Sequence, residues 1–122
     1  MILSVEPMEA LRYANFLSEG GWIVSNARPF VNIPNYPGEA ELKDAYKRFP
    51  NSFLLDTDEM ASGLGSRKVS NMIILGAASS HLGIDFEALE KAIKAIFGRK
   101  GEEIVQLNLD ALNAGKEAAM AV

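Results

Sequence analysis

Apolar residues in the first half of the chain fall into short runs that alternate with segments of helical spacing. The runs lie at residues 1–5, 21–26 and 51–58, and their lack of polar alternation is typical of strands buried on both faces of a sheet. The two segments between them, residues 7–20 and 38–49, each keep apolar side chains on one side of a helix. The order strand, helix, strand, helix, strand predicts parallel strands joined by crossover helices.

Signals for helix ends support this division, and the second half of the chain predicts further helices. Pro7 suits a first helical turn and Gly20 a C-terminal cap. Residues 67–80 contain the run MIIL, which fits a strand or a helix, and we interpret the segment as a buried helix. Residues 83–98 predict a helix that Asp85 caps and Gly98 ends. The last segment, residues 101–122, carries two adjacent apolar stripes, which predict a helix in a crowded place or at an interface.

These elements predict an α/β fold in one domain of residues 1–122. We expect a Rossmann-like, three-layer arrangement around about three parallel strands, followed by a helical C-terminal half. Sheets of this kind usually have roughly four to six strands, and the chain begins inside a strand. The sequence therefore predicts a fragment of a larger α/β unit, with a strand edge that a partner or a second copy in a homodimer covers.

Composition and charge narrow the classes of function. The chain has 122 residues, 48% of them hydrophobic, and a net charge of −4 without a basic run, so it lacks the positive face that nucleic-acid binding needs. No apolar stretch approaches the roughly 20 residues of a membrane helix, and we expect a soluble, cytoplasmic protein without a membrane partner. With no cysteine and one histidine, the sequence predicts no iron–sulfur ligation and no self-contained metal site.

A stiff connection follows the second apolar run. Residues 28–37, called the proline loop below, contain three prolines, and Arg28, Ile33 and Tyr36 each precede one of them. Proline fixes its own φ and pushes the residue before it toward extended geometry. We therefore expect the loop to hold one shape and to present its side chains to a partner.

Polar residues gather where the predicted strands end. In a parallel sheet, ligands bind at the carboxyl ends of the strands, because loops converge there and helix N-termini point outward. The alternative for any single residue is ordinary, because Glu6 can simply cap a helix and the others can be solvated loop residues. We predict a binding or docking surface formed by Glu6, Ser25, Asn26, Arg28, Asn32, Asn35 and Tyr36.

Other candidates for chemistry have simpler explanations. His81 lies where a helix is expected to end, and an imidazole there commonly meets free carbonyl groups. The glycines of residues 62–66 lack the spacing of a phosphate-binding loop. Asp56 and Asp58 suggest a cation clamp, but no third ligand lies nearby in sequence, and the start of a helix is the simpler interpretation. We predict no catalytic residue and no metal ligand in this chain.

Several longer motifs carry a family resemblance. They are EPMEALRY at residues 6–13, GGWIVSN at 20–26, NIPNYP at 32–37, NMIILGAASSHLGI at 71–84 and EEIVQLNLDALNAG at 102–115. Together they resemble the gamma-type domain of the 2-oxoacid:ferredoxin oxidoreductases, the pyruvate and indolepyruvate family, over nearly the whole chain. Members of that family begin with a glycine-rich G-x-G-G-Q-G turn, and this chain resembles the domain without that N-terminal part.

The resemblance implies an accessory subunit or domain of an enzyme that oxidatively decarboxylates a 2-oxoacid, indolepyruvate or pyruvate, to an acyl-CoA, with ferredoxin as electron acceptor. It implies a catalytic, thiamine-binding subunit as partner, with thiamine diphosphate, iron–sulfur clusters and coenzyme A belonging to the whole complex. The chain alone is then expected to be inactive and to bind no cofactor itself. Two alternatives keep the fold without the enzyme: a stand-alone protein-interaction module, and a small-ligand-binding domain that uses residues 28–37.

Overall fold

The computed structural model describes residues 1–30 and 34–121. They divide into two compact units, Met1–Asp56, called unit 1 below, and Thr57–Val122, called unit 2. That the whole of residues 1–122 is one domain stays a prediction. None of the described helices is long and apolar enough to cross a membrane.

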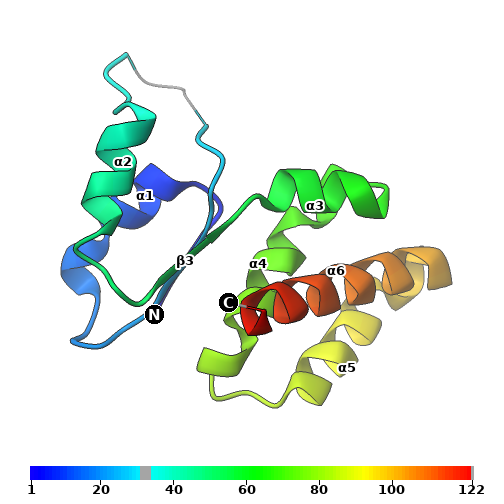
Figure 1. Cartoon of the computed structure of the whole chain (residues 1–122). Helices are drawn as coiled ribbons and strands as arrows, with labels where there is room; N and C mark the ends of the chain where they lie inside the picture. Colours follow the sequence, from blue (N-terminus) through cyan, green and yellow to red (C-terminus); the bar gives the residue numbers. More distant parts are fainter. Residues whose placement is uncertain (31–33, 122) are drawn as a thin grey trace. The chain divides into compact units, whose positions relative to one another are not determined.

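Unit 1 is a parallel sheet with two crossover helices (Figure 1). Its strands β1 (Ile2–Ser4), β2 (Ile23–Asn26) and β3 (Ser52–Leu55) lie in that order, and both neighbouring pairs are parallel. Helix α1 (Pro7–Arg12) connects β1 to β2, and α2 (Glu39–Tyr46) connects β2 to β3. The predicted order and direction of the strands are therefore confirmed.

The core of unit 1 forms between one face of this sheet and both helices. In the ladder, Ile2 lies beside Ile23, and Leu54 lies beside Ser25, so these side chains share a face. Ala10 of α1 and Leu42 of α2 pack against that face in one apolar cluster. Because each crossover leaves the carboxyl end of a strand, the segment that leads into each helix begins at that edge of the sheet.

Helix α1 is shorter than the sequence predicts. Pro7 occupies its first turn as expected, but the helix ends at Arg12. The Tyr13 N–H donates to the Ala10 carbonyl at 3.2 Å, which tightens the last turn, and a short 3₁₀ segment follows at Ala14–Phe16. Gly20, with a φ of 74°, therefore turns the chain toward β2 and does not cap α1.

Unit 2 is helical and contains α3 (Thr57–Leu64), α4 (Ser70–Ala78), α5 (Phe86–Phe97) and α6 (Glu102–Met120) (Figure 1). Helix α4 confirms the interpretation of the MIIL run as helical. Helix α6 packs against the other three helices, which confirms the crowded position that its wide apolar face predicts.

The ends of α5 follow the sequence signals only in part. The helix ends at Phe97, directly before Gly98, as predicted. Asp85 holds the N-cap position, but its side chain makes no capping hydrogen bond, and its backbone carbonyl accepts from the Ala88 N–H at 2.9 Å. The position of the cap is therefore confirmed, whereas the expected side-chain bond is not formed.

Two glycines allow α4 and α6 to cross at close range. A Cβ atom added to Gly76 would lie 1.9 Å from the Leu112 carbonyl oxygen, and one added to Gly115 would lie 1.9 Å from the Ile73 carbonyl oxygen. Each glycine therefore faces the backbone of the other helix, and neither position has room for a side chain.

Candidate functional site

The structure places six of the seven predicted surface residues in unit 1, and Asn32 lies outside the described residues. Glu6 follows β1, and Ser25 and Asn26 end β2. Tyr36 and the exposed Asn35 precede α2. Most of these positions therefore lie at or just beyond the carboxyl ends of the first two strands, as the sequence predicts for Glu6, Ser25 and Asn26.

Glu6 is the centre of the hydrogen bonds in this region. Its carboxylate Oε1 accepts from the Glu9 N–H at 2.9 Å and so caps α1. Its Oε2 accepts from the Phe30 N–H at 3.0 Å and from the Tyr36 hydroxyl at 2.5 Å. The side chain thus joins the start of α1 to two points of the proline loop, and only 8% of the residue is exposed.

The carboxylate is buried and nevertheless favours its ionised form. Burial by itself raises the pKa of Glu6, but hydrogen bonds from Tyr36 and from the backbone N–H groups of Phe30 and Glu9 lower it by more. The pKa of Glu6 therefore lies below its ordinary value. On the other side of the bond, burial and the Glu6 carboxylate raise the pKa of Tyr36, so the phenol stays a donor.

Asn26 and Arg28 shape the beginning of the proline loop. The Arg28 N–H donates to Asn26 Oδ1 at 3.2 Å, and the Ser25 hydroxyl donates to the Asn26 carbonyl at 3.0 Å. An Arg28 guanidinium nitrogen lies 2.8 Å from Asp56 Oδ2, directly after β3. This ion pair is partly exposed, so it contributes little stability but links the loop to the neighbouring strand end.

Tyr46 connects α2 to the start of α1. Its buried hydroxyl donates to the Pro7 carbonyl at 2.6 Å. Burial raises the pKa of Tyr46 to about 12; the nearby Glu6 carboxylate adds to this rise, and a hydrogen bond with Ser25 opposes it. At neutral pH the phenol is therefore fully protonated and holds the two helices together.

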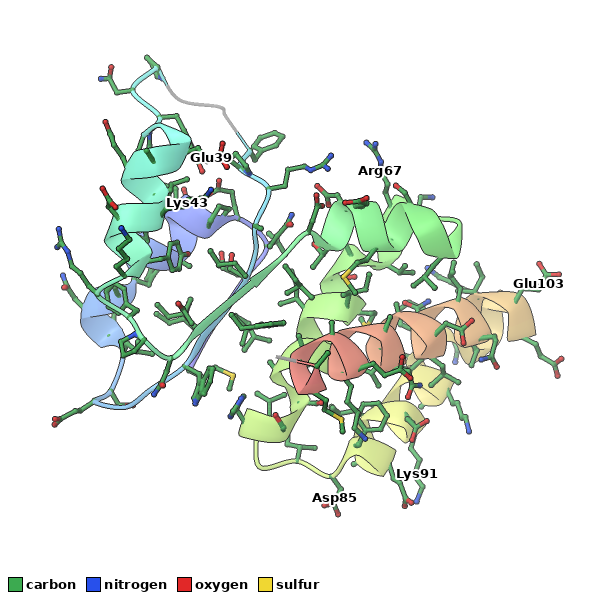
Figure 2. All side chains as sticks on the ribbon, viewed as in Figure 1. Glu39, Lys43, Arg67, Asp85, Lys91 and Glu103 are labelled. Carbon is green, nitrogen blue, oxygen red and sulfur yellow. The ribbon has the colours of Figure 1, made fainter. Side chains whose placement is uncertain are left out.

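An open, mostly apolar pocket of about 490 Å³ lies beside these contacts, a volume within the usual range for small-molecule sites. Glu39 and Lys43, labelled in Figure 2, contribute its charged part and form an exposed ion pair at 3.2 Å. Its walls come from both helices, a strand and the proline loop. The lining residues are Pro7, Ala27, Pro29, Tyr36, Pro37, Glu39, Leu42, Lys43, Tyr46 and Leu54.

Among the residues that line this pocket, the predicted docking surface contains only Tyr36, and the small-ligand alternative over residues 28–37 also covers Pro29 and Pro37. Pro7 was not predicted as a site residue, although it supplies rigid apolar surface next to a predicted strand end. What was missing is the packing of α2, which brings Leu42 and Tyr46 to the same place. That packing depends on the sheet and not on local pattern.

The other candidates take structural positions. Asp58 lies in the first turn of α3, as the simpler interpretation predicts, and Asp56 pairs with Arg28. His81 is exposed at the end of the short 3₁₀ segment Ser79–His81. Within residues 1–30 and 34–121, no group of three or more His, Cys, Asp or Glu residues could hold a metal ion.

Comparison with known proteins gives a consistent set of similarities. The sequence pattern of the family described as pyruvate ferredoxin/flavodoxin oxidoreductase matches residues 1–118. The chain is 32% identical to indolepyruvate oxidoreductase subunit IorB of Pyrococcus horikoshii and 32% identical to that of Thermococcus kodakarensis. Each match covers 98% of this chain but 62% of the relative, so the chain spans about three fifths of the length of these relatives.

A solved structure shares the fold. It is 2-oxoglutarate:ferredoxin oxidoreductase from Magnetococcus marinus with 2-oxoglutarate, coenzyme A and succinyl-CoA bound. The match has a TM-score of 0.67 at 24% sequence identity, and it covers 98% of this chain and 19% of the other. The same arrangement of strands and helices therefore occurs as a small part of a much larger polypeptide.

Proposed function

Because the chain belongs to the pyruvate ferredoxin/flavodoxin oxidoreductase family, we propose that it is an accessory, gamma-type subunit or domain of a 2-oxoacid:ferredoxin oxidoreductase. The enzyme oxidatively decarboxylates indolepyruvate or pyruvate to an acyl-CoA in the cytoplasm, with ferredoxin as electron acceptor. The observation that carries this proposal is the family match over residues 1–118, with 32% identity to two subunits of indolepyruvate oxidoreductase.

In this proposal the redox chemistry takes place on a partner. The sequence has no cysteine, so it supplies no thiolate for an iron–sulfur cluster. Thiamine diphosphate and the clusters belong to a catalytic polypeptide, and this chain contributes a shaped surface. That docking surface consists of the described residues Glu6, Ser25, Asn26, Arg28, Asn35 and Tyr36, and the isolated chain is inactive.

Purification from the native host tests the proposal. A tagged chain is expected to bring with it one large polypeptide that contains thiamine diphosphate, and adding the chain to that polypeptide is expected to raise its turnover of 2-oxoacids with ferredoxin. The chain alone is expected to show no turnover. Recovery of the chain without any thiamine-containing polypeptide would reject the proposal.

The pocket in unit 1 favours a second candidate, binding of a small ligand. Its volume of about 490 Å³ and its mostly apolar lining, with Lys43 at one side, fit an organic molecule of moderate size. Calorimetric titration of the chain with coenzyme A, indolepyruvate and pyruvate separates this candidate from docking alone. A measurable heat of binding with one of these molecules supports a ligand role. No heat of binding with any of them rejects it.

A further inference from the structure

One carboxylate holds two points of the proline loop. Phe30 lies near the beginning of the loop and Tyr36 near its end, and both donate to Glu6 Oε2, at 3.0 Å and 2.5 Å. The donors lie 24 and 30 residues from Glu6 in sequence, so these bonds are tertiary contacts and not part of a local turn. Glu6 itself is almost fully buried.

We infer that Glu6 is a positioning residue: its carboxylate fixes Phe30 and Tyr36, at the two described ends of the proline loop, against the start of α1 and thereby sets the affinity of the docking surface. This inference rests on the proposed function for the docking step, but the hold on the loop can be measured in the chain alone. Since Glu6 is 8% exposed, it acts through Tyr36 and Phe30 more than through its own contact with a partner.

The number of donors explains why a carboxylate is needed at this position. Oε1 accepts the backbone N–H of Glu9, and Oε2 accepts the backbone N–H of Phe30. Backbone N–H groups can only donate, whereas the Tyr36 hydroxyl can also accept. A glutamine has one acceptor oxygen and one NH₂ group, so it cannot keep both bonds. The cap joins residues three apart in sequence and the loop bond joins residues 24 apart, so the bond to the loop is the one expected to break.

The same contact shapes the pocket. Tyr36 and Pro37 are among its lining residues, and α2 begins two residues later at Glu39. Tyr46 of α2, another lining residue, donates a hydrogen bond to the carbonyl of Pro7, the residue after Glu6. Glu6, which binds Phe30 and Tyr36, and Pro7, which binds Tyr46 of α2, are therefore neighbours in the sequence. Releasing the contacts of Glu6 is expected to loosen the loop residues Phe30 and Tyr36 first.

The alternative is that Glu6 serves only as a helix cap. The cap uses Oε1 alone, and α1 has six residues, so a cap-only role predicts no effect at the loop. Glu9 offers a matched control on the same helix, because its carboxylate is half-exposed and lies 3.5 Å from the Arg12 guanidinium. Glu6→Gln and Glu9→Gln each remove one negative charge, from the N-cap and from the first turn of α1 respectively.

Amide hydrogen exchange in the full chain measures the hold on the loop directly. In Glu6→Gln the Phe30 amide is expected to exchange about tenfold faster than in the wild type, since its acceptor is lost. Glu9→Gln is expected to leave that rate unchanged. The ring signals of Tyr36 give a second readout: burial and the Glu6 carboxylate raise the pKa of Tyr36, and in Glu6→Gln this pKa is expected to fall toward its ordinary value.

Affinity for the thiamine-containing polypeptide completes the test. Glu6→Gln is expected to weaken docking by about tenfold, in line with the change in exchange, and Glu9→Gln is expected to bind like the wild type. Should Glu6→Gln fail to fold, Tyr36→Phe keeps the cap and the Phe30 bond, and it must weaken docking as well.

Two results would overturn the inference: an unchanged exchange rate at Phe30 in Glu6→Gln, or faster exchange together with wild-type affinity. If the wild-type chain binds no such polypeptide, the proposed function fails. The exchange rate at Phe30 then decides alone whether Glu6 holds the loop.

Discussion

Glu6 shows how a nearly buried carboxylate stays ionised when donors converge on it. Two backbone N–H groups and the Tyr36 hydroxyl surround its oxygens, and they outweigh the cost of burial. The sequence predicted Glu6 both as a member of the surface and, alternatively, as a helix cap, and the structure shows it as the cap and as the partner of the loop. The link to Tyr36 could not be predicted, because nothing in the local pattern tells which loop returns to the start of α1.

Because the pKa of Glu6 is lowered in the folded chain, the free energy of unfolding is expected to fall in acid. Since the folded chain binds a proton at Glu6 less tightly than the unfolded chain, the contribution of Glu6 is full above the ordinary glutamate value of roughly 4.3 and is lost as the pH falls through the folded pKa. Glu6→Gln is expected to lower the free energy of unfolding by about 1.5–3 kcal/mol at pH 7. Urea denaturation of the wild type and of Glu6→Gln at pH 7 and below about pH 4 checks this prediction. A difference in unfolding free energy between the two that does not shrink in acid would contradict it.

The raised pKa of Tyr46 predicts the opposite pH dependence, with stability lost at alkaline pH. Because the folded pKa of about 12 lies above the unfolded value of roughly 10, the stability from this phenol is full below that unfolded value and is lost as the pH rises through the folded pKa. Removing the hydroxyl in Tyr46→Phe leaves the Pro7 carbonyl without this donor and is expected to cost about 1–2 kcal/mol at neutral pH. Denaturation curves should show that cost shrinking in strong alkali; an equal cost at both pH values would count against the buried hydrogen bond.

At the scale of elements, the strands and helices follow from periodicity, and their contacts do not. The apolar runs of β1, β2 and β3 and the stripes of α5 and α6 were readable, because burial on one or both faces leaves a pattern in sequence. The early end of α1 at Arg12 was missed, because tightening into a 3₁₀ turn leaves no comparable pattern. The pocket was missed since it is formed by α1, α2, β3 and the loop together.

The crossing of α4 and α6 gives a prediction for the helical unit. Gly76→Ala and Gly115→Ala each place a methyl group against the backbone of the other helix, so each is expected to cost at least about 2 kcal/mol of unfolding free energy. Gly63→Ala in α3 is the control, since its added Cβ meets nothing within 4 Å, and it is expected to stabilise the chain by about 0.5–1 kcal/mol. Thermal melts of the three variants compare them, and equal effects at all three positions would refute the close crossing.

On the scale of the whole molecule, the predicted site lies in unit 1 and the close helical packing in unit 2. The family was readable from motifs such as EPMEALRY and NMIILGAASSHLGI, and the match over residues 1–118 confirms it. A homodimer through a strand edge stays a prediction. So does the role of each surface residue, because a docking surface is defined by a partner whose sequence this chain does not contain.

The central claim is that the proline loop docks onto a catalytic polypeptide, and paired measurements on Asn35→Ala and Tyr36→Ala test it most directly. Affinity for the thiamine-containing polypeptide and melting temperature are measured for both variants and the wild type. Asn35 is exposed, so its replacement should leave the melting temperature within about 2 °C while weakening docking by about tenfold, and Tyr36→Ala should also lose more docking than stability. Equal losses in docking and stability for both variants would show that the loop is only scaffold and would contradict the claim.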